Sequence, residues 1–167
     1  LHRRIAEFEA QASADRVSER AAQLAVHFER GGDPVRAIAH LQQAATNALK
    51  RQAFQESIEL LQHALALLAS LPPSTARDES ELVVQLQLSQ PLLMTKGYGA
   101  PEVAAVMARA RSLVRPLEPS PALLPALLGL ARFHYFRSEL DEGLAVGEQC
   151  LTLAQHAPDR KSTRLNS

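Results

Sequence analysis

The side chains of this sequence that could do chemistry are six histidines, one cysteine and a few neighbouring carboxylates. A metal site needs several such ligands at close spacing, for example two histidines four residues apart on one helix face. The histidines stand singly, with no cysteine beside them; they are His2, His27, His40, His63, His134 and His156. We therefore predict no metal site, and we interpret His27 and His134 as packed side chains that a carbonyl oxygen satisfies.

Nucleophilic and acid–base chemistry have equally little support. A reactive Cys150 would need a base and an orienting group within hydrogen-bonding reach, and the sequence indicates neither, so we expect a small buried side chain. The carboxylate neighbours Glu56 with Glu59 and Asp141 with Glu142 are typical of solvated helix faces. We predict that this segment holds no catalytic residue and is not an enzyme; a small stand-alone enzyme remains the least favoured alternative.

Two glycine-containing segments resemble nucleotide-binding loops at first sight. Residues 31–34, Gly-Gly-Asp-Pro, lack the Gly-Lys-Ser/Thr ending that would place a lysine and a hydroxyl on phosphate and magnesium. Residues 96–99, Lys-Gly-Tyr-Gly, follow no predicted strand and do not have the spacing of the dinucleotide fingerprint. We predict that both are turns between helices and that the segment binds no cofactor.

Charge and composition exclude further classes of function. The 167 residues carry 18 Lys and Arg against 18 Asp and Glu, so no net field attracts nucleic acid or an anionic membrane. The longest run without a charge, residues 60–76, is interrupted by Pro72 and Pro73 and is too short to span a bilayer. One cysteine gives no sign of an oxidising compartment. We therefore expect a cytoplasmic chain whose partners are proteins or peptides.

Helices are the elements that would position these side chains. Alanine and leucine dominate the apolar residues, and unbranched side chains favour helix. Apolar residues recur every three or four positions in every segment, and none alternates with period two. The predicted stripes are Val17, Ala21, Leu24 and Phe28; Ile38, Leu41, Ala45 and Ala48; Ile58, Leu61, Leu65 and Leu68; Val103, Met107, Ala110 and Val114; Leu124, Leu128, Ala131 and Tyr135; and Leu140, Leu144, Gly147, Leu151 and Ala154. A further amphipathic helix is expected over Leu1–Ala12.

Glycine and proline divide the chain into helices of similar length. Breaks are predicted at 31–34, 52–53, 71–73, 97–101, 116–121 and 137–140. Pro34 and Pro101 stand where a helix can begin. The polar stretch 74–81 predicts a longer loop, with Asp78 or Ser80 capping the next helix, and Pro91 predicts an interruption with a kink near Gln87.

Helices of this length need neighbours to cover their apolar stripes, so short connections predict antiparallel hairpins. The pattern Ala37-Ile38, Leu41, Ala44 returns as Ser57-Ile58, Leu61, Ala64, which favours stacked hairpins over a closed bundle. Residues 53–64 resemble the second helix of a tetratricopeptide repeat, with Phe54, Ser57, Leu61 and Ala64 at its aromatic, small, large and small positions. The spacing is nearer twenty residues than thirty-four. The resemblance implies an all-α, tetratricopeptide-like α-solenoid over residues 1–158.

The order of segments resembles a narrower family, the C-terminal helical region of bacterial signalling proteins that join a cyclase or DNA-binding domain to a STAND-type ATPase. The stretches that carry this resemblance are residues 1–6, His27-Phe28, Ala37-Ile38, 92–103 and 128–133. It implies a non-catalytic regulatory or interaction segment of an ATPase–adenylate (or guanylate) cyclase protein, whose catalytic domains lie upstream. An effector-sensing region of a transcription regulator is the alternative.

Arg132, Phe133, Tyr135, Phe136 and Arg137 gather three aromatic rings and two arginines in six residues, and these types are enriched at interaction hot spots. We predict partner binding by one or two of them, with Arg132, Tyr135, Phe136 and Arg137 as the candidates. Packing in the core is the alternative role for most.

The two ends suggest a fragment of a longer protein. The chain begins at Leu1 without a methionine, and residues 159–167, Asp-Arg-Lys-Ser-Thr-Arg-Leu-Asn-Ser, resemble the translation of a sequencing-library adapter. We therefore expect these nine residues to be an artefactual tail.

Overall fold

The structure of the chain is a computed structural model that describes residues 20–114 and 123–156. These residues form α3 (Ala21–Arg30), α4 (Pro34–Lys50), α5 (Phe54–Ser70), α6 (Thr75–Lys96), α7 (Pro101–Val114), α8 (Leu124–Phe136) and α9 (Leu140–His156). No strand occurs in the described part, so the predicted all-α class is confirmed. The predictions for Leu1–Ala12, for the break at 116–121 and for the tail 159–167 lie outside the described residues.

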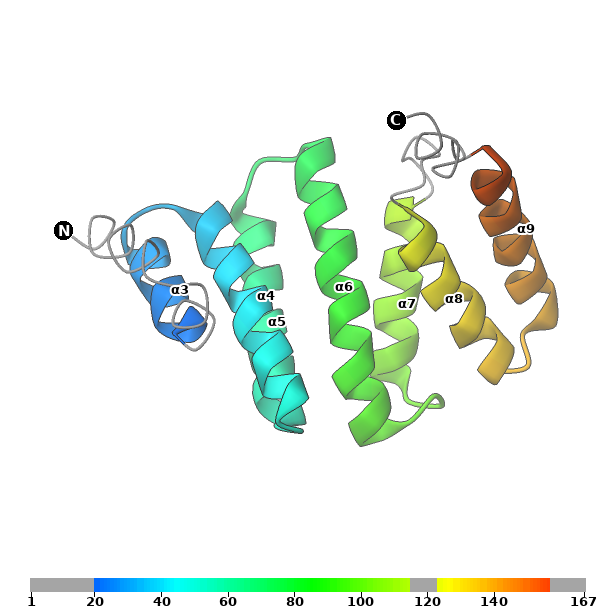
Figure 1. The fold of residues 1–167 in the computed structure, drawn as a ribbon, viewed down its shortest axis with the longest axis horizontal. Helices are drawn as coiled ribbons and strands as arrows, with labels where there is room; N and C mark the ends of the chain where they lie inside the picture. Colours follow the sequence, from blue (N-terminus) through cyan, green and yellow to red (C-terminus); the bar gives the residue numbers. More distant parts are fainter. Residues whose placement is uncertain (1–19, 115–122, 157–167) are drawn as a thin grey trace, which may run out of the picture.

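Each helix packs against the next one along the chain (Figure 1). The helices therefore follow one another from α3 at one end of the molecule to α9 at the other. The contact between α7 and α8 is the smallest of these, and α6 also touches α8. One long apolar core runs from Ala25 of α3 through to Val146 and Cys150 of α9.

The predicted apolar stripes of α3, α4, α5 and α7 are confirmed for the described residues; Val17, predicted in the first of them, lies outside these residues. In α4 the residues Ile38, Leu41, Ala45 and Ala48 are buried, and Ala21, Leu24 and Phe28 are buried in α3. The stripe of α5 is buried apart from Leu65, which is half-buried, and that of α7 apart from Val114, which is also half-buried. Burial of this kind is what stabilises helices that are marginal alone.

Three connections between helices share one geometry. The middle residue of each is left-handed: Gly32 (φ 76°) before α4, Gln52 (φ 61°) before α5 and Ser138 (φ 60°) before α9. In each, the next amide donates to a carbonyl five residues back, from Asp33 to Phe28 (2.9 Å), Ala53 to Ala48 (2.9 Å) and Glu139 to His134 (3.0 Å). This is the wrapping bond of a Schellman helix end, and it lets the next helix start at once.

The prediction of a long loop over residues 74–81 is wrong. Helix α6 begins at Thr75, and the Ser74 hydroxyl caps it by accepting the Arg77 amide at 3.2 Å. Serine is among the preferred residues at that position because its oxygen satisfies an amide that has no helical partner. The stretch is polar because most of it forms an exposed first part of a helix.

Pro91 does not end the helix, and the kink near Gln87 stays a prediction. Helix α6 passes through Pro91 and continues to Lys96 (Figure 1). The Pro91 ring is among the most deeply buried side chains, so packing compensates for the amide that proline cannot donate. Its own carbonyl accepts a hydrogen bond from the Thr95 hydroxyl at 2.9 Å.

The stripes of the last two helices differ from prediction. In α8 the buried residues are Ala126, Leu127, Leu130, Phe133 and His134, not the predicted set. Helix α8 is apolar on most of its surface, so periodicity alone does not identify its inner face. In α9 the predicted stripe is largely exposed, and Val146 and Cys150 are the buried residues instead.

Candidate binding surface

Exposed apolar side chains concentrate on α8 and α9. Among the described residues, the large hydrophobic side chains that remain exposed are Val26, Val35, Val83, Met94, Leu128, Tyr135, Phe136, Leu140, Leu144 and Leu151. Six of these ten lie between Leu128 and Leu151, and we call those six the α8–α9 surface. Clustered exposed apolar groups mark interaction sites more often than scattered ones do.

The aromatic residues predicted to bind a partner lie on this surface. Tyr135 is 67% exposed and Phe136 is 55% exposed, whereas the neighbouring Phe133 is buried. The Phe136 ring lies 4.7 Å from the ring of Tyr98, in the α6–α7 connection, and 5.6 Å from that of Tyr135. Arg132 is exposed on the same helix. The rings therefore form a small aromatic patch that solvent reaches.

Arg137, the fourth predicted residue, is held by contacts within the molecule. Its Nη1 donates to the Tyr98 carbonyl oxygen at 3.1 Å, and its Nε donates to Glu139 Oε1 at 2.7 Å. The guanidinium also lies over the Phe133 ring, 5.5 Å from the centroid. These contacts attach the end of α8 to the α6–α7 connection, so the structure gives Arg137 a role in positioning the aromatic patch.

His134 is buried and satisfied, as the sequence predicts, but its partner is a carboxylate. Its Nδ1 lies 2.8 Å from Glu139 Oε2. Hydrogen bonds from Arg137 first, and from His134 second, lower the pKa of Glu139 below its ordinary value. Glu139 thus joins both side chains just before α9 begins.

Helix α9 has the same register as α4 and α5 when each is counted from its left-handed residue. The fifth residue is Ala37, Ser57 or Gly143, and the sixth is Ile38, Ile58 or Leu144. The twelfth is Ala44, Ala64 or Cys150, and the thirteenth is Ala45, Leu65 or Leu151. Small residues thus recur at the fifth and twelfth positions, and Cys150 is the buried small side chain that the sequence predicts.

The fifth residue contacts the preceding helix in the same way in two hairpins. The Ser57 hydroxyl donates to the Ala45 carbonyl at 3.0 Å, twelve residues back in the chain. A Cβ on Gly143 would lie 3.8 Å from the Ala131 carbonyl oxygen, also twelve residues back (143 − 131), and 3.6 Å from His134 Cβ. The α8–α9 hairpin therefore repeats the packing of the α4–α5 hairpin.

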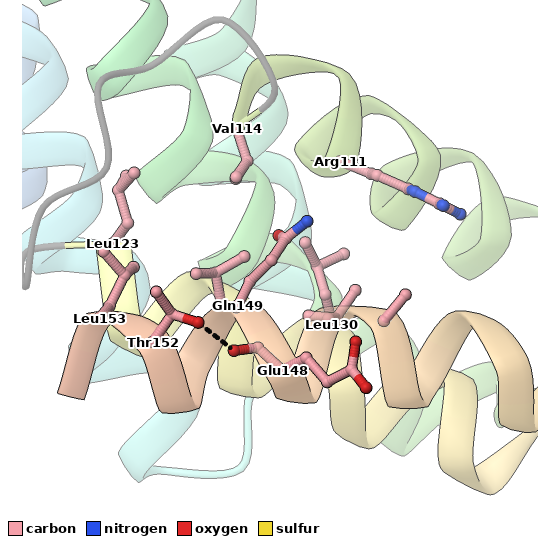
Figure 2. Close-up of a pocket in the computed structure, with 11 residues that line it drawn as sticks. Arg111, Val114, Leu123, Leu130, Glu148, Gln149, Thr152 and Leu153 are labelled. Atoms are coloured by element: carbon pink, nitrogen blue, oxygen red, sulfur yellow. Dashed lines mark hydrogen bonds between the residues drawn. The ribbon is translucent and has the colours of Figure 1, made fainter. Parts of the chain in front are cut away.

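A groove of about 630 Å³ opens between α7, α8 and α9 (Figure 2). Its apolar lining comes from Val114, Leu123, Leu127, Leu130, Ala145, Val146 and Leu153, and its polar lining from Arg111, Glu148, Gln149 and Thr152. Figure 2 shows the Gln149 side chain pointing from α9 toward Arg111 and Val114. Neither the stripes nor the breaks in the sequence indicate this groove, because it arises from the weak contact of α7 with α8.

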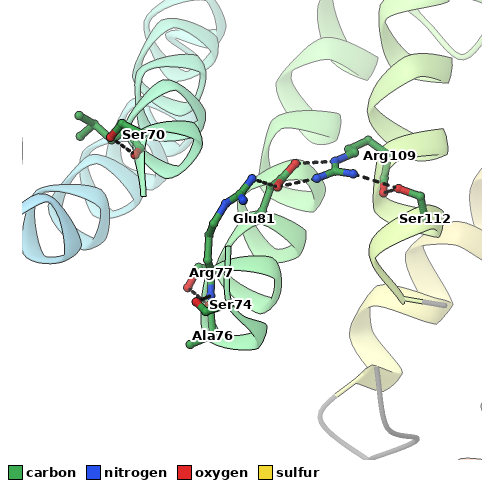
Figure 3. A network of polar contacts seen from close by, with 9 residues as sticks. Ser70, Ser74, Ala76, Arg77, Glu81, Arg109 and Ser112 are labelled. Carbon is green, nitrogen blue, oxygen red and sulfur yellow. Dashed lines mark hydrogen bonds and ion pairs between the residues drawn. The ribbon is translucent and has the colours of Figure 1, made fainter. Parts of the chain in front are cut away.

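An ion pair between a buried glutamate and an exposed arginine joins α6 to α7 (Figure 3). Glu81 is 7% exposed, and Arg109 donates to both of its oxygens, from Nε at 2.6 Å and from Nη2 at 2.8 Å. Arg77 lies on the other side of Glu81, with Nη2 at 3.5 Å. The hydrogen bonds from Arg109 are the main reason why the pKa of Glu81 lies below its ordinary value. Both arginines contact Glu81, so we assign the cluster a structural role.

The described residues contain no group of three or more His, Cys, Asp or Glu side chains that could hold a metal ion. Within the same ranges, none of the helices combines the length and the apolar character that a membrane crossing requires. In comparisons with known proteins, no protein-family model matches the chain and no curated protein matches it.

Proposed function

We propose that this chain is a non-catalytic, tetratricopeptide-like α-solenoid that binds protein or peptide partners in the cytoplasm. The observation that carries the proposal is the α8–α9 surface, where six exposed apolar side chains gather on two adjacent helices. Apolar and aromatic groups of this kind supply most of the free energy at protein interfaces. Arg132, Tyr135 and Phe136 are the proposed contact residues, and Arg137 fixes their position through Tyr98.

The solenoid arrangement is supported by the repeated connections before α4, α5 and α9 and by the packing of each helix on the next. An array built in this way gains stability from each neighbouring pair and presents an extended surface. Extended surfaces suit binding, whereas catalysis needs polar groups that converge in an enclosed site.

We further propose, from the resemblance in sequence, that the segment regulates a multidomain signalling protein with a STAND-type ATPase and an adenylate or guanylate cyclase upstream. The alternative is the effector-sensing region of a transcription regulator with a DNA-binding domain upstream. Both place the binding surface in a regulatory arm and differ in the domain it regulates.

Sequencing the genomic locus on both sides of the coding region tests this proposal. An ATPase and a cyclase domain in the same reading frame would support it, and a DNA-binding domain in place of the cyclase would favour the alternative. The nucleotide turnover of the longer protein is then measured with the segment intact and with Tyr135→Ala. We expect the variant to change regulation of turnover while the segment alone shows none. Turnover by the segment itself would contradict the proposal.

A further inference from the structure

We propose that the exposed leucine stripe of α9 docks an amphipathic helix of a partner polypeptide that carries lysine or arginine along one edge of its own apolar stripe. The α9 stripe is defined as Leu140, Leu144 and Leu151, with Gly147 between the last two. The inference rests on the proposed binding function and deepens it, because it names the docking face and the chemistry of the partner.

The first argument is the burial of equivalent residues elsewhere in the chain. Ile38 and Ile58 occupy the position of Leu144 in α4 and α5, and each is 5% exposed. Leu144 is 64% exposed. The next helix along the chain packs on α4 and on α5, whereas no described helix follows α9. The α9 stripe therefore has the residues and the register of a face that a helix covers.

A hydrogen bond between α4 and α5 shows how the equivalent face of α4 is covered. Ala45, at the thirteenth position of α4, accepts the hydrogen bond from Ser57 of the following helix. Leu151 holds the thirteenth position of α9 and is 59% exposed. A helix placed on α9 as α5 lies on α4 would thus meet Leu151, and the interface would continue the one already present in the molecule.

The shape of the stripe suits a helix with large apolar side chains. The spacing 140, 144, 147, 151 alternates four and three residues, which is the seam of two packed helices. A Cβ on Gly147 would meet nothing within 4 Å, so the stripe has a gap between Leu144 and Leu151. A bulky side chain of the partner can fill that gap as a knob fills a hole.

The charge beside the stripe selects a basic partner. Asp141 and Glu148, seven residues apart, lie along one edge of the stripe, and both are exposed. Neither forms an ion pair with a described residue. No Lys or Arg occurs from Ser138 to His156, and Arg111 of α7, which lines the same groove as Glu148, forms no ion pair with it. Lys or Arg on the partner would complement the two carboxylates, as at the flanks of paired helices.

The same charges disfavour a second copy of this chain as the occupant. When two copies of α9 pack antiparallel through the stripe, the edge with Asp141 and Glu148 faces its own counterpart. Four carboxylates then gather with no cation between them, and such like-charge pairs destabilise helix contacts. A basic helix of another polypeptide has no such repulsion.

A pair of synthetic peptides tests the proposal on the full chain. The first is an amphipathic peptide of about 18 residues, comparable in length to α9, with leucine at the seam positions and lysine at the flanks. The second is identical except for glutamate in place of lysine. Fluorescence anisotropy measures the binding of each. We expect the lysine peptide to bind about tenfold more tightly at low salt, with the preference reduced at high salt.

Matched variants localise the binding. Leu144→Ser with Leu151→Ser should weaken the lysine peptide at least about thirtyfold, because two apolar anchors are lost. The control is Met94→Ser on α6, since Met94 is 65% exposed and Leu144 is 64% exposed; this variant should bind within about twofold of the unchanged chain. Asp141→Lys with Glu148→Lys should reverse the preference, so that the glutamate peptide binds more tightly. Circular dichroism verifies that each variant is folded.

Three results would overturn the inference: no binding of the lysine peptide, equal binding to the double serine variant, or self-association that this variant abolishes. Loss of binding in Gln149→Lys with retention in the double serine variant would place the peptide in the groove and overturn it as well. The proposed regulatory function has a separate test in the turnover of the longer protein, so it can survive each of these outcomes.

Discussion

Helices α4 and α9 differ little in pattern and greatly in environment. Both begin two residues after a left-handed residue, and both have a large apolar residue six positions after that left-handed residue. Ile38 is buried beneath its neighbours, whereas Leu144 is exposed to solvent. The difference shows that an apolar stripe in the sequence fixes where a helix can pack, while the elements around it fix whether it is covered.

The largest expected difference is between the stability losses caused by replacing a buried leucine of α5 and an exposed leucine of α9. Leu61→Ala in α5 should lower the free energy of unfolding by about 2–5 kcal/mol, because it removes a side chain that is 1% exposed and leaves a cavity. Leu144→Ala in α9 should change it by less than about 0.5 kcal/mol. Urea unfolding of the full chain measures both. Equal losses of unfolding free energy in the two variants would mean that the α9 stripe is already buried in the protein without a partner.

The ion pair between α6 and α7, two helices that lie between α4 and α9 along the chain, should have the next largest effect. Glu81→Ala leaves Arg109 and Arg77 without their shared partner and should cost about 1–3 kcal/mol of unfolding free energy. Glu142→Ala, an exposed carboxylate of α9, is the control and should be nearly neutral.

The pH dependence of stability sharpens this prediction. The pKa of Glu81 lies below the ordinary value of 4.5, so its stabilising contribution is present above pH 4.5 and disappears as the pH falls through the lower pKa of the folded state. Glu81→Gln should therefore be less sensitive than the unchanged chain to acidification in that range. Thermal unfolding at a series of pH values measures this, and parallel curves would contradict the assigned ion pair.

A third comparison concerns the three equivalent turns. Gly32→Ala should lower stability by about 1 kcal/mol, since φ is 76° there and a Cβ disfavours that conformation. Gln52→Gly and Ser138→Gly should each be neutral or stabilising by up to about 1 kcal/mol, because relief at φ near 60° opposes the greater freedom of the unfolded chain. Destabilisation by both glycine variants would show that their side chains contribute more than the backbone conformation costs.

The smallest expected effect lies within the α9 stripe. Gly147 stands where α4 and α5 have Leu41 and Leu61, and the space around it is open. Gly147→Ala should raise the free energy of unfolding by about 0.5–1 kcal/mol through helix propensity alone. Thermal unfolding measures the gain, and a loss would indicate that a neighbouring group already occupies that space.

Much of the fold could be predicted from local signals. Pro34 and Pro101 identify helix starts, and the glycines at 31, 32 and 97 identify ends, because backbone chemistry at those positions does not depend on distant contacts. The sequence did not predict the left-handed conformation of Gln52 and Ser138, since glutamine and serine, unlike glycine, do not favour a positive φ. Their equivalence to Gly32 appears only when the three connections are compared in space.

The candidate surface was predictable only in part. The cluster Arg132 to Arg137 indicated the exposed rings of Tyr135 and Phe136 but not that Arg137 is engaged by Tyr98, whose place depends on packing between distant segments. The exposure of Leu144 and Leu151 was not predictable either, because periodicity reports an apolar face and not its neighbour. The polar stretch before Glu81 was wrongly predicted as a loop because an exposed first part of a helix is as polar as a loop, and Arg77 pairs with Glu81 within the same helix.

The rate at which Cys150 reacts with a thiol reagent can report how often α9, the last described helix, separates from α8. Cys150 is the single thiol of the sequence, it is 8% exposed between α8 and α9, and burial raises its pKa. A thiol reagent should therefore modify it faster when α9 moves away from α8, so the rate of labelling reports that opening without any engineered probe. A bound partner helix would lower the labelling rate of Cys150, and without the partner the rate would be higher.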